Sequence, residues 1–90
     1  MAAGPSPGNR VRVRCLFFAA YRDILGAEEI EFELPEGSTV ERLIEEVRAR
    51  AGAPNLPQQL AVAVNREYAS RDTALSDGDE VAFIPPVAGG

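Results

Sequence analysis

A chain of 90 residues makes one small domain, large enough for a sheet and a single main helix but with little room for a deep catalytic pocket. Its net charge of −5 argues against nucleic acid and anionic membranes as partners, and it favours a basic cleft on another protein. The lack of histidine and the single cysteine exclude an internal disulfide, a Cys/His metal site and the usual nucleophile–histidine catalytic pairs.

The composition also bears on cellular location and chemistry. No apolar run approaches the roughly 20 residues that span a bilayer, and no secretory signal opens the chain, so we expect a cytoplasmic protein. All nine basic residues are arginine, so the chain has no lysine through which copies of itself could be linked. We expect it to bind no cofactor or metal of its own, and any catalytic acid–base groups to come from a partner protein.

The first nine residues contain two prolines, two glycines and a serine without any periodicity, which is typical of a disordered leader. A folded domain is expected over residues 10–84, and an extended tail over residues 85–90. From Arg10 to Phe18 arginines alternate with apolar residues, which predicts a half-buried strand. Cys15 lies on the apolar side, so we expect a buried structural thiol. Leu16 and Phe18 place apolar groups on the arginine side.

Residues 19–26 predict a helical turn that is closed by Gly26. Residues 28–34 alternate glutamate with apolar residues, which predicts a second strand. The two strands can pair as a hairpin with glutamates opposite arginines, because cross-strand pairs of opposite charge are favourable. Arg22 and Asp23, in the helical turn, read as a solvated surface pair.

One clear helix is predicted over residues 38–51. Ser38 and Glu41 have the spacing of a capping box, and Gly52 is a suitable residue to end the helix. An apolar stripe at helical spacing predicts the face that packs on the sheet, and it consists of Val40, Leu43, Ile44, Val47 and Ala51.

Three more strands are expected, at residues 60–64, 68–69 and 81–84, with turns at 65–67 and 77–79. The acidic turn at 77–79 has too few ligands for a calcium loop, and turn chemistry explains it fully. Strand, strand, helix and further strands form an α+β pattern with a mixed sheet of four to five strands. A single main helix covers only one face, so the other face is a candidate docking surface, with Leu16, Phe18 and Ile84 on it.

The last six residues predict an extended tail. Two prolines stop the final strand, because neither donates a hydrogen bond to a sheet and each fixes its own φ. The residues after them are small, and glycine lets a foreign backbone approach closely, so the tip could enter a narrow channel. Its reactive group is the C-terminal carboxylate, which a partner enzyme could activate as an acyl-adenylate and convert to a thioacid or an amide. The tail consists of Pro85, Pro86, Val87, Ala88, Gly89 and Gly90.

Three stretches, Leu16–Ala19 with Arg22, Ala63–Asn65 and Leu75–Gly90, carry a further signal. Together they resemble the MoaD family, the small subunits of molybdopterin synthase, and the last stretch is the specific one. The resemblance covers residues 11–90. It implies a ubiquitin-like β-grasp fold, which agrees with the predicted order of elements.

The resemblance also implies a function as a sulfur carrier in molybdenum cofactor biosynthesis. A ubiquitin-activating-like adenylyltransferase of the MoeB type would use ATP to adenylate Gly90, and a sulfurtransferase system would convert it to a thiocarboxylate. The tail would then enter the large catalytic subunit, of the MoaE type, and donate sulfur to cyclic pyranopterin monophosphate. Two transfers make the dithiolene of molybdopterin, and the complex would be a heterotetramer. Arg22 would contact the activating enzyme.

Three alternatives remain open from the sequence. A sulfur carrier of the same fold could serve thiamine thiazole synthesis or tRNA thiolation, since those tails also end in Gly-Gly. A ubiquitin-like modifier would instead be joined through Gly90 to lysines of target proteins. A plain interaction domain would carry an inert tail.

Overall fold

The computed structural model describes residues 10–51, 56 and 60–85. The predicted leader, the helix-ending Gly52 and tail residues 86–90 lie outside this part of the chain. The order of elements is as predicted, with boundaries that differ by a residue or two. The elements are β1 (Arg10–Phe17), α1 (Ala20–Leu25), β2 (Glu29–Pro35), α2 (Val40–Ala51), β3 (Ala61–Val64), β4 (Glu67–Ala69) and β5 (Glu80–Ile84).

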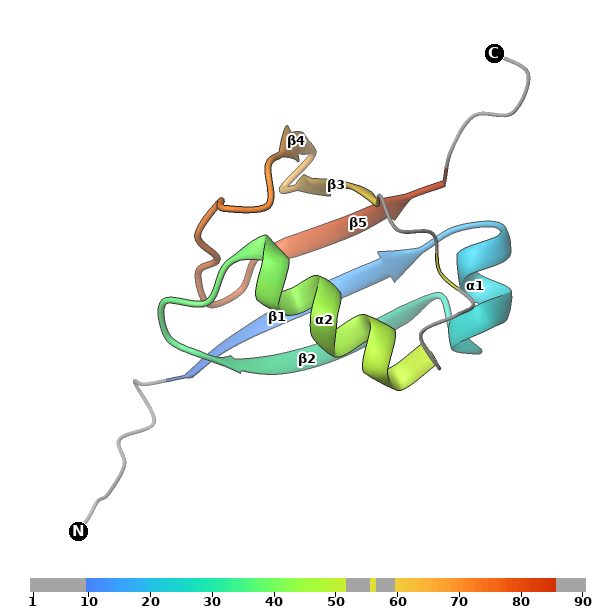
Figure 1. Ribbon diagram of the computed structural model, residues 1–90, viewed down its shortest axis with the longest axis horizontal. Helices are drawn as coiled ribbons and strands as arrows, with labels where there is room; N and C mark the ends of the chain where they lie inside the picture. Colours follow the sequence, from blue (N-terminus) through green and yellow to red (C-terminus); the bar gives the residue numbers. More distant parts are fainter. Residues whose placement is uncertain (1–9, 52–55, 57–59, 86–90) are drawn as a thin grey trace, which may run out of the picture.

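The strands form one mixed sheet in the order β2-β1-β5-β3-β4, which confirms the α+β prediction (Figure 1). β1 and β5 are parallel, and the other neighbours in the sheet are antiparallel. β1 and β2 pair as predicted, with arginines opposite glutamates. The ion pairs between them run diagonally, however: Arg14 is opposite Glu31 but lies 3.7 Å from Glu29.

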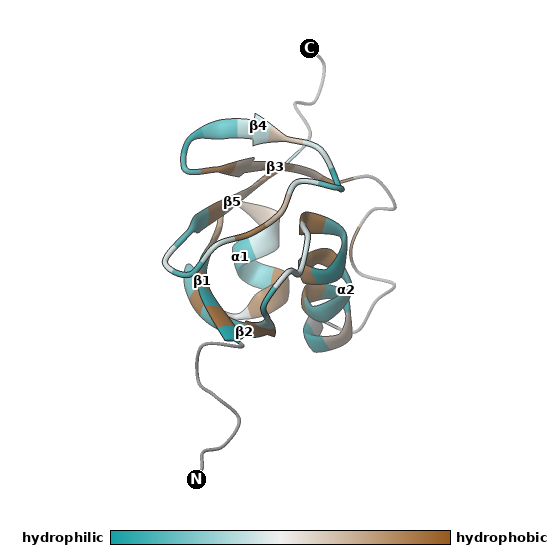
Figure 2. Cartoon of the chain, turned by 90° about the vertical axis from the view of Figure 1, so that its left-hand side faces the viewer, coloured by the Kyte–Doolittle hydropathy of each residue, from teal (hydrophilic) through white to brown (hydrophobic). Residues whose placement is uncertain are grey.

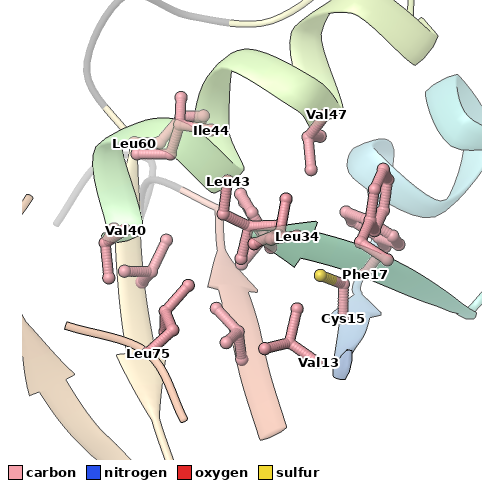
Figure 3. Close-up of a cluster of buried hydrophobic side chains, with 14 of the residues drawn as sticks. Val13, Cys15, Phe17, Leu34, Val40, Leu43, Ile44, Val47, Leu60 and Leu75 are labelled. Carbon is pink, nitrogen blue, oxygen red and sulfur yellow. The ribbon is translucent and has the colours of Figure 1, made fainter. Parts of the chain in front are cut away.

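The core lies between α2 and one face of the sheet, and Figure 2 shows the helix standing to one side of the strands. Phe17 of β1 and Phe83 of β5 are register partners, and their ring centroids lie 5.2 Å apart. The predicted apolar stripe of α2 is buried at its described side chains (Figure 3), which are Val40, Leu43, Ile44 and Val47. Burial of these side chains is the main source of stability in a domain of this size.

The start of α2 differs from the prediction. The Ser38 hydroxyl donates to the Pro35 carbonyl at 2.6 Å, and the helix begins only at Val40, so the capping box is wrong. The first amide groups of the helix donate instead to a distant segment of the chain. The Val40 amide donates to the Thr73 carbonyl at 3.0 Å, and the Glu41 amide donates to the Arg71 carbonyl at 2.8 Å. Hydrogen bonds to this distant segment therefore satisfy the amide groups at the start of the helix, which a local cap would otherwise satisfy.

Candidate functional site

The predicted tail leaves the sheet from its central strand. β5 is hydrogen-bonded to β1 on one side and to β3 on the other. Ile84 ends the strand and Pro85 follows it, and both side chains are half-buried. The remaining residues assigned to the tail, 86–90, lie outside the described residues. The tail is thus attached to a strand that is fixed along both edges.

The opposite end of β5 is held by a polar network. The Asp77 carboxylate accepts a hydrogen bond from the Arg12 amide at 2.8 Å. The Asn65 side chain donates to Asp79 at 2.9 Å and accepts from the Glu80 amide at 3.0 Å. These contacts give a structural role to Asn65 and to the turn at residues 77–79, which belong to two of the sequence stretches noted above. Both fix the start of β5 in the sheet. They do not contribute reactive groups.

An apolar area lies on the face of the sheet that α2 does not cover, and we call it the outer apolar surface. Leu16, Phe18 and Ile84, the residues predicted for docking, all belong to it. Leu16 is a register partner of Ala82 on β5, and Ala82 is a partner of Ala63 on β3. The surface consists of Leu16, Phe18, Ala61, Tyr68, Ala82 and Ile84, together with the buried Ala63 that pairs with Tyr68.

Tyr68 of β4 is a member of this surface that the sequence analysis missed. It is paired with Ala63 and is 78% exposed. Two large apolar side chains are exposed among the described residues, and Tyr68 has the greater exposed fraction. Its face is set by the register of the β3–β4 hairpin, in which residues opposite each other point to the same face.

Phe18 is the other exposed large apolar side chain, at 46%. It lies where β1 ends. Because β1 and β5 are parallel, β1 finishes at the same end of the sheet as β5, where the tail begins. Phe18 and Leu16 line a hollow of about 330 Å³ together with the ion pair of Arg22 and Glu28. An exposed aromatic side chain therefore lies at the end of the sheet where Pro85 follows β5.

The turn after Phe18 has an unusual backbone. The Tyr21 amide donates to the Phe18 carbonyl at 3.0 Å, and Ala19 has φ 51° and ψ −126°. These values fit the first central position of a type II′ turn, which glycine normally occupies. An alanine in such a conformation costs about 1–3 kcal/mol, and the neighbouring structure must maintain it.

Arg22 lies on α1 and is exposed. Its guanidinium is 3.4 Å from the Glu28 carboxylate, so its partner is Glu28 and not the neighbouring Asp23. Both side chains are well exposed to solvent, and such pairs contribute little to stability. The geometry leaves Arg22 at the rim of the hollow beside Phe18, where a partner protein can reach it.

Two further groups are buried. Cys15 is 0% exposed, and burial raises the pKa of its thiol to about 12, which makes it unreactive as predicted (Figure 3). Tyr21 is 3% exposed, and its hydroxyl has no hydrogen-bond partner among the residues that the structure describes. Burial raises the pKa of Tyr21, and the positive charge of Arg48 opposes the shift. Neither group is available to a substrate.

Over residues 10–51, 56 and 60–85, no three acidic, cysteine or histidine side chains gather closely enough to hold a metal ion. Within the same part of the chain, no helix is both long enough and apolar enough to cross a membrane. What the described residues offer is an anchored strand that leads into the tail, with an apolar surface beside it.

Comparison with known proteins adds an independent finding. The model of the ThiS family matches residues 15–90. The molybdopterin synthase sulfur carrier subunit of Escherichia coli is 41% identical over 83 residues, which cover 87% of this chain and 99% of that protein.

Solved structures give the same picture of the fold. A putative molybdopterin converting factor subunit 1 from Pyrococcus furiosus has a TM-score of 0.78 and 38% identity, covering 86% of this chain and 99% of that one. A chain from the Helicobacter pylori complex of subunits 1 and 2 of molybdopterin-converting factor has a TM-score of 0.64 and 23% identity. That match covers 89% of this chain and 100% of the other, and it bears on the fold alone.

Proposed function

The chain belongs to the ThiS family, and from that premise we propose that it is the sulfur carrier subunit of a molybdopterin synthase. The observation that carries the proposal is the position of β5. The strand that leads into the tail is the central strand of the sheet, and it ends beside the outer apolar surface. A protein bound to this surface would lie next to Pro85, the residue at which the tail begins.

The proposed chemistry takes place at Gly90. A free carboxylate is a poor acyl electrophile, so a MoeB-type enzyme uses ATP to form the acyl-adenylate and releases pyrophosphate. A persulfide sulfur from a sulfurtransferase then displaces AMP, and reduction of the resulting acyl disulfide by a thiol leaves a thiocarboxylate. Its sulfur is transferred to cyclic pyranopterin monophosphate in the large subunit, and water restores the carboxylate. Gly89 provides the clearance that a narrow channel requires.

Docking of the MoaE-type large subunit is assigned to the outer apolar surface. Exposed apolar side chains that form one area on a monomer are typical of interaction sites. Phe18 and Tyr68 are the aromatic anchors of this area, and aromatic residues dominate binding energy at interfaces. The prolines at the start of the tail, Pro85 and Pro86, limit its conformational freedom, so less entropy is lost when it enters the partner.

The direct test is the intact mass of the chain, isolated from its own cells through an N-terminal tag. We expect a fraction that is heavier by one exchange of oxygen for sulfur, localised to Gly90 by fragmentation. A ladder of adducts with other proteins would point instead to a modifier. An unmodified mass, under conditions in which the cofactor is being made, would contradict the sulfur-carrier proposal.

The pathway is tested by adding the thiocarboxylated chain to a MoaE-type subunit and cyclic pyranopterin monophosphate. We expect molybdopterin to form, and deletion of Gly90 to abolish sulfur transfer while folding and docking stay nearly unchanged. The unmodified carboxylate form is the matched negative control. A thiocarboxylated chain that fails in this assay but supports thiamine thiazole synthesis or tRNA thiolation would assign the carrier to those pathways.

A further inference from the structure

The type II′ turn at the end of β1 sets the positions of two aromatic side chains. On one side of Ala19 the Phe18 side chain is 46% exposed, and on the other side Tyr21 is buried at 3%. The turn is held by backbone hydrogen bonds on both sides. The Tyr21 amide donates to Phe18, the Arg22 amide donates to Ala19 at 3.1 Å, and the Phe17 amide donates to the Glu28 carbonyl at 2.8 Å.

We propose that Ala19 is a positioning residue for partner binding: its strained backbone fixes Phe18 in the outward orientation that the partner recognises. This inference rests on the proposed function, because it takes the outer apolar surface as the docking site. Ala19 itself needs no contact with the partner. It acts through the backbone of Phe18.

The argument compares alanine with glycine at this position. Glycine would remove the strain at a positive φ, so selection for stability alone favours glycine there. Glycine would also give the turn access to more conformations, and Phe18 would then lose more freedom when it binds. An alanine at this position therefore lowers the stability of the free protein and reduces the ordering that binding requires.

The chain offers a matched control in the β3–β4 hairpin. Asn65 and Arg66 form its two-residue turn, with φ 52° and 74°. Both values are positive, as a type I′ turn requires, and glycine is the preferred residue at the second position. Arg66 is therefore a second strained non-glycine residue, but it does not belong to the outer apolar surface.

The experiment measures thermal unfolding of the full chain and its affinity for a MoaE-type large subunit, by calorimetry, for Ala19→Gly and Arg66→Gly. We expect both variants to raise Tm, by about 4–8 °C for each kcal/mol of strain released. Only Ala19→Gly should weaken binding, by about three- to tenfold. Higher stability with weaker binding is a combination that general structural damage does not produce.

A double-mutant cycle with Phe18→Ala then tests whether Ala19 acts through Phe18. We expect Phe18→Ala to weaken binding, and Ala19→Gly to have no further effect in the Phe18→Ala background. If Phe18→Ala weakens binding but Ala19→Gly does not, the role of Ala19 is overturned and the docking surface stands. If Phe18→Ala leaves the affinity unchanged, the docking surface is wrong as well. If Ala19→Gly weakens binding as much in the Phe18→Ala background as it does in the wild-type chain, the inference is also overturned.

Discussion

Where β1 and β5 end, residues that are adjacent in the sequence lie on opposite faces of the sheet. Phe17 and Phe83 are buried against α2, whereas Phe18 and Ile84 belong to the outer apolar surface. All four are large and apolar, so composition does not separate them. The alternation of the strand separates them: one of each pair stabilises the fold, and we propose that the other binds a partner. Substitutions on the two faces should therefore affect different measurements.

The largest effect is expected on the inner face, for Phe83→Ala. Phe83 is 1% exposed and packs against Phe17, so its truncation removes buried area and leaves a cavity. We expect a loss of about 3–5 kcal/mol in the free energy of unfolding, measured by urea denaturation. Ile84→Ala is the matched outer-face control and should cost much less. Equal losses for the two variants would contradict the division between faces.

A second inner-face prediction concerns alkaline pH. The pKa of Cys15 is raised from 9.0 to about 12, so the thiolate forms more readily in the unfolded chain than in the folded one. The stabilisation is fully present below pH 9.0, falls as pH rises, and is lost once pH passes about 12. At 1.36 kcal/mol per pH unit it amounts to about 4 kcal/mol.

The measurement is the free energy of unfolding against pH for the wild-type chain and for Cys15→Val. The variant should lose most of the alkaline dependence. A smaller dependence of the same sign should remain, because burial also raises the pKa of Tyr21. If both proteins lose stability in parallel above pH 9, other groups are responsible.

On the outer face, Phe18→Asp should weaken binding to the large subunit by about a hundredfold, because docking would bury an unpaired charge. Stability should change little, since Phe18 is exposed. Ala49→Glu on the exposed side of α2 adds the same charge away from the surface and serves as the control. Similar affinities for both variants would place the docking site elsewhere.

The smallest effect is expected for Tyr68→Ala, which should weaken binding by about tenfold. Tyr68 is on the edge strand β4, so this variant asks how far the docking surface extends from the tail. Arg71→Ala, in the loop after β4, is a nearby control. If Tyr68→Ala binds with wild-type affinity, the docking surface does not extend to β4.

Much of the fold could be predicted from the sequence because its strands alternate and its helix has an apolar stripe. The start of α2 could not, because the groups that accept from its first amides lie on residues 71 and 73, far along the chain. A Ser38–Glu41 pattern has the correct local spacing and gives no sign of that competition. The prediction of a reactive tail came from its composition and from family resemblance, and residues 86–90 lie outside the described part of the chain.

Two parts of the candidate site depend on geometry that the sequence does not display. Ala19 is an unremarkable residue in the sequence, and its role in the turn is visible only in its dihedral angles. Tyr68 follows a turn whose length was predicted as three residues, whereas the hairpin turns on two. That one-residue difference decides which face each residue of β4 occupies.

The central position of β5 also affects how the chain folds. Among the described residues, β5 is the last strand in chain order, yet it lies between β1 and β3 in the sheet. β1 and β3 do not pair with each other, so only β5 joins them. Such non-local pairing forms late, since loop closure must precede the contacts that reward it. During synthesis, the sheet cannot be completed until β5 has been made. A nascent chain that stops before β5 therefore lacks the strand that joins β1 to β3, and with it Ala82 and Ile84 of the outer apolar surface.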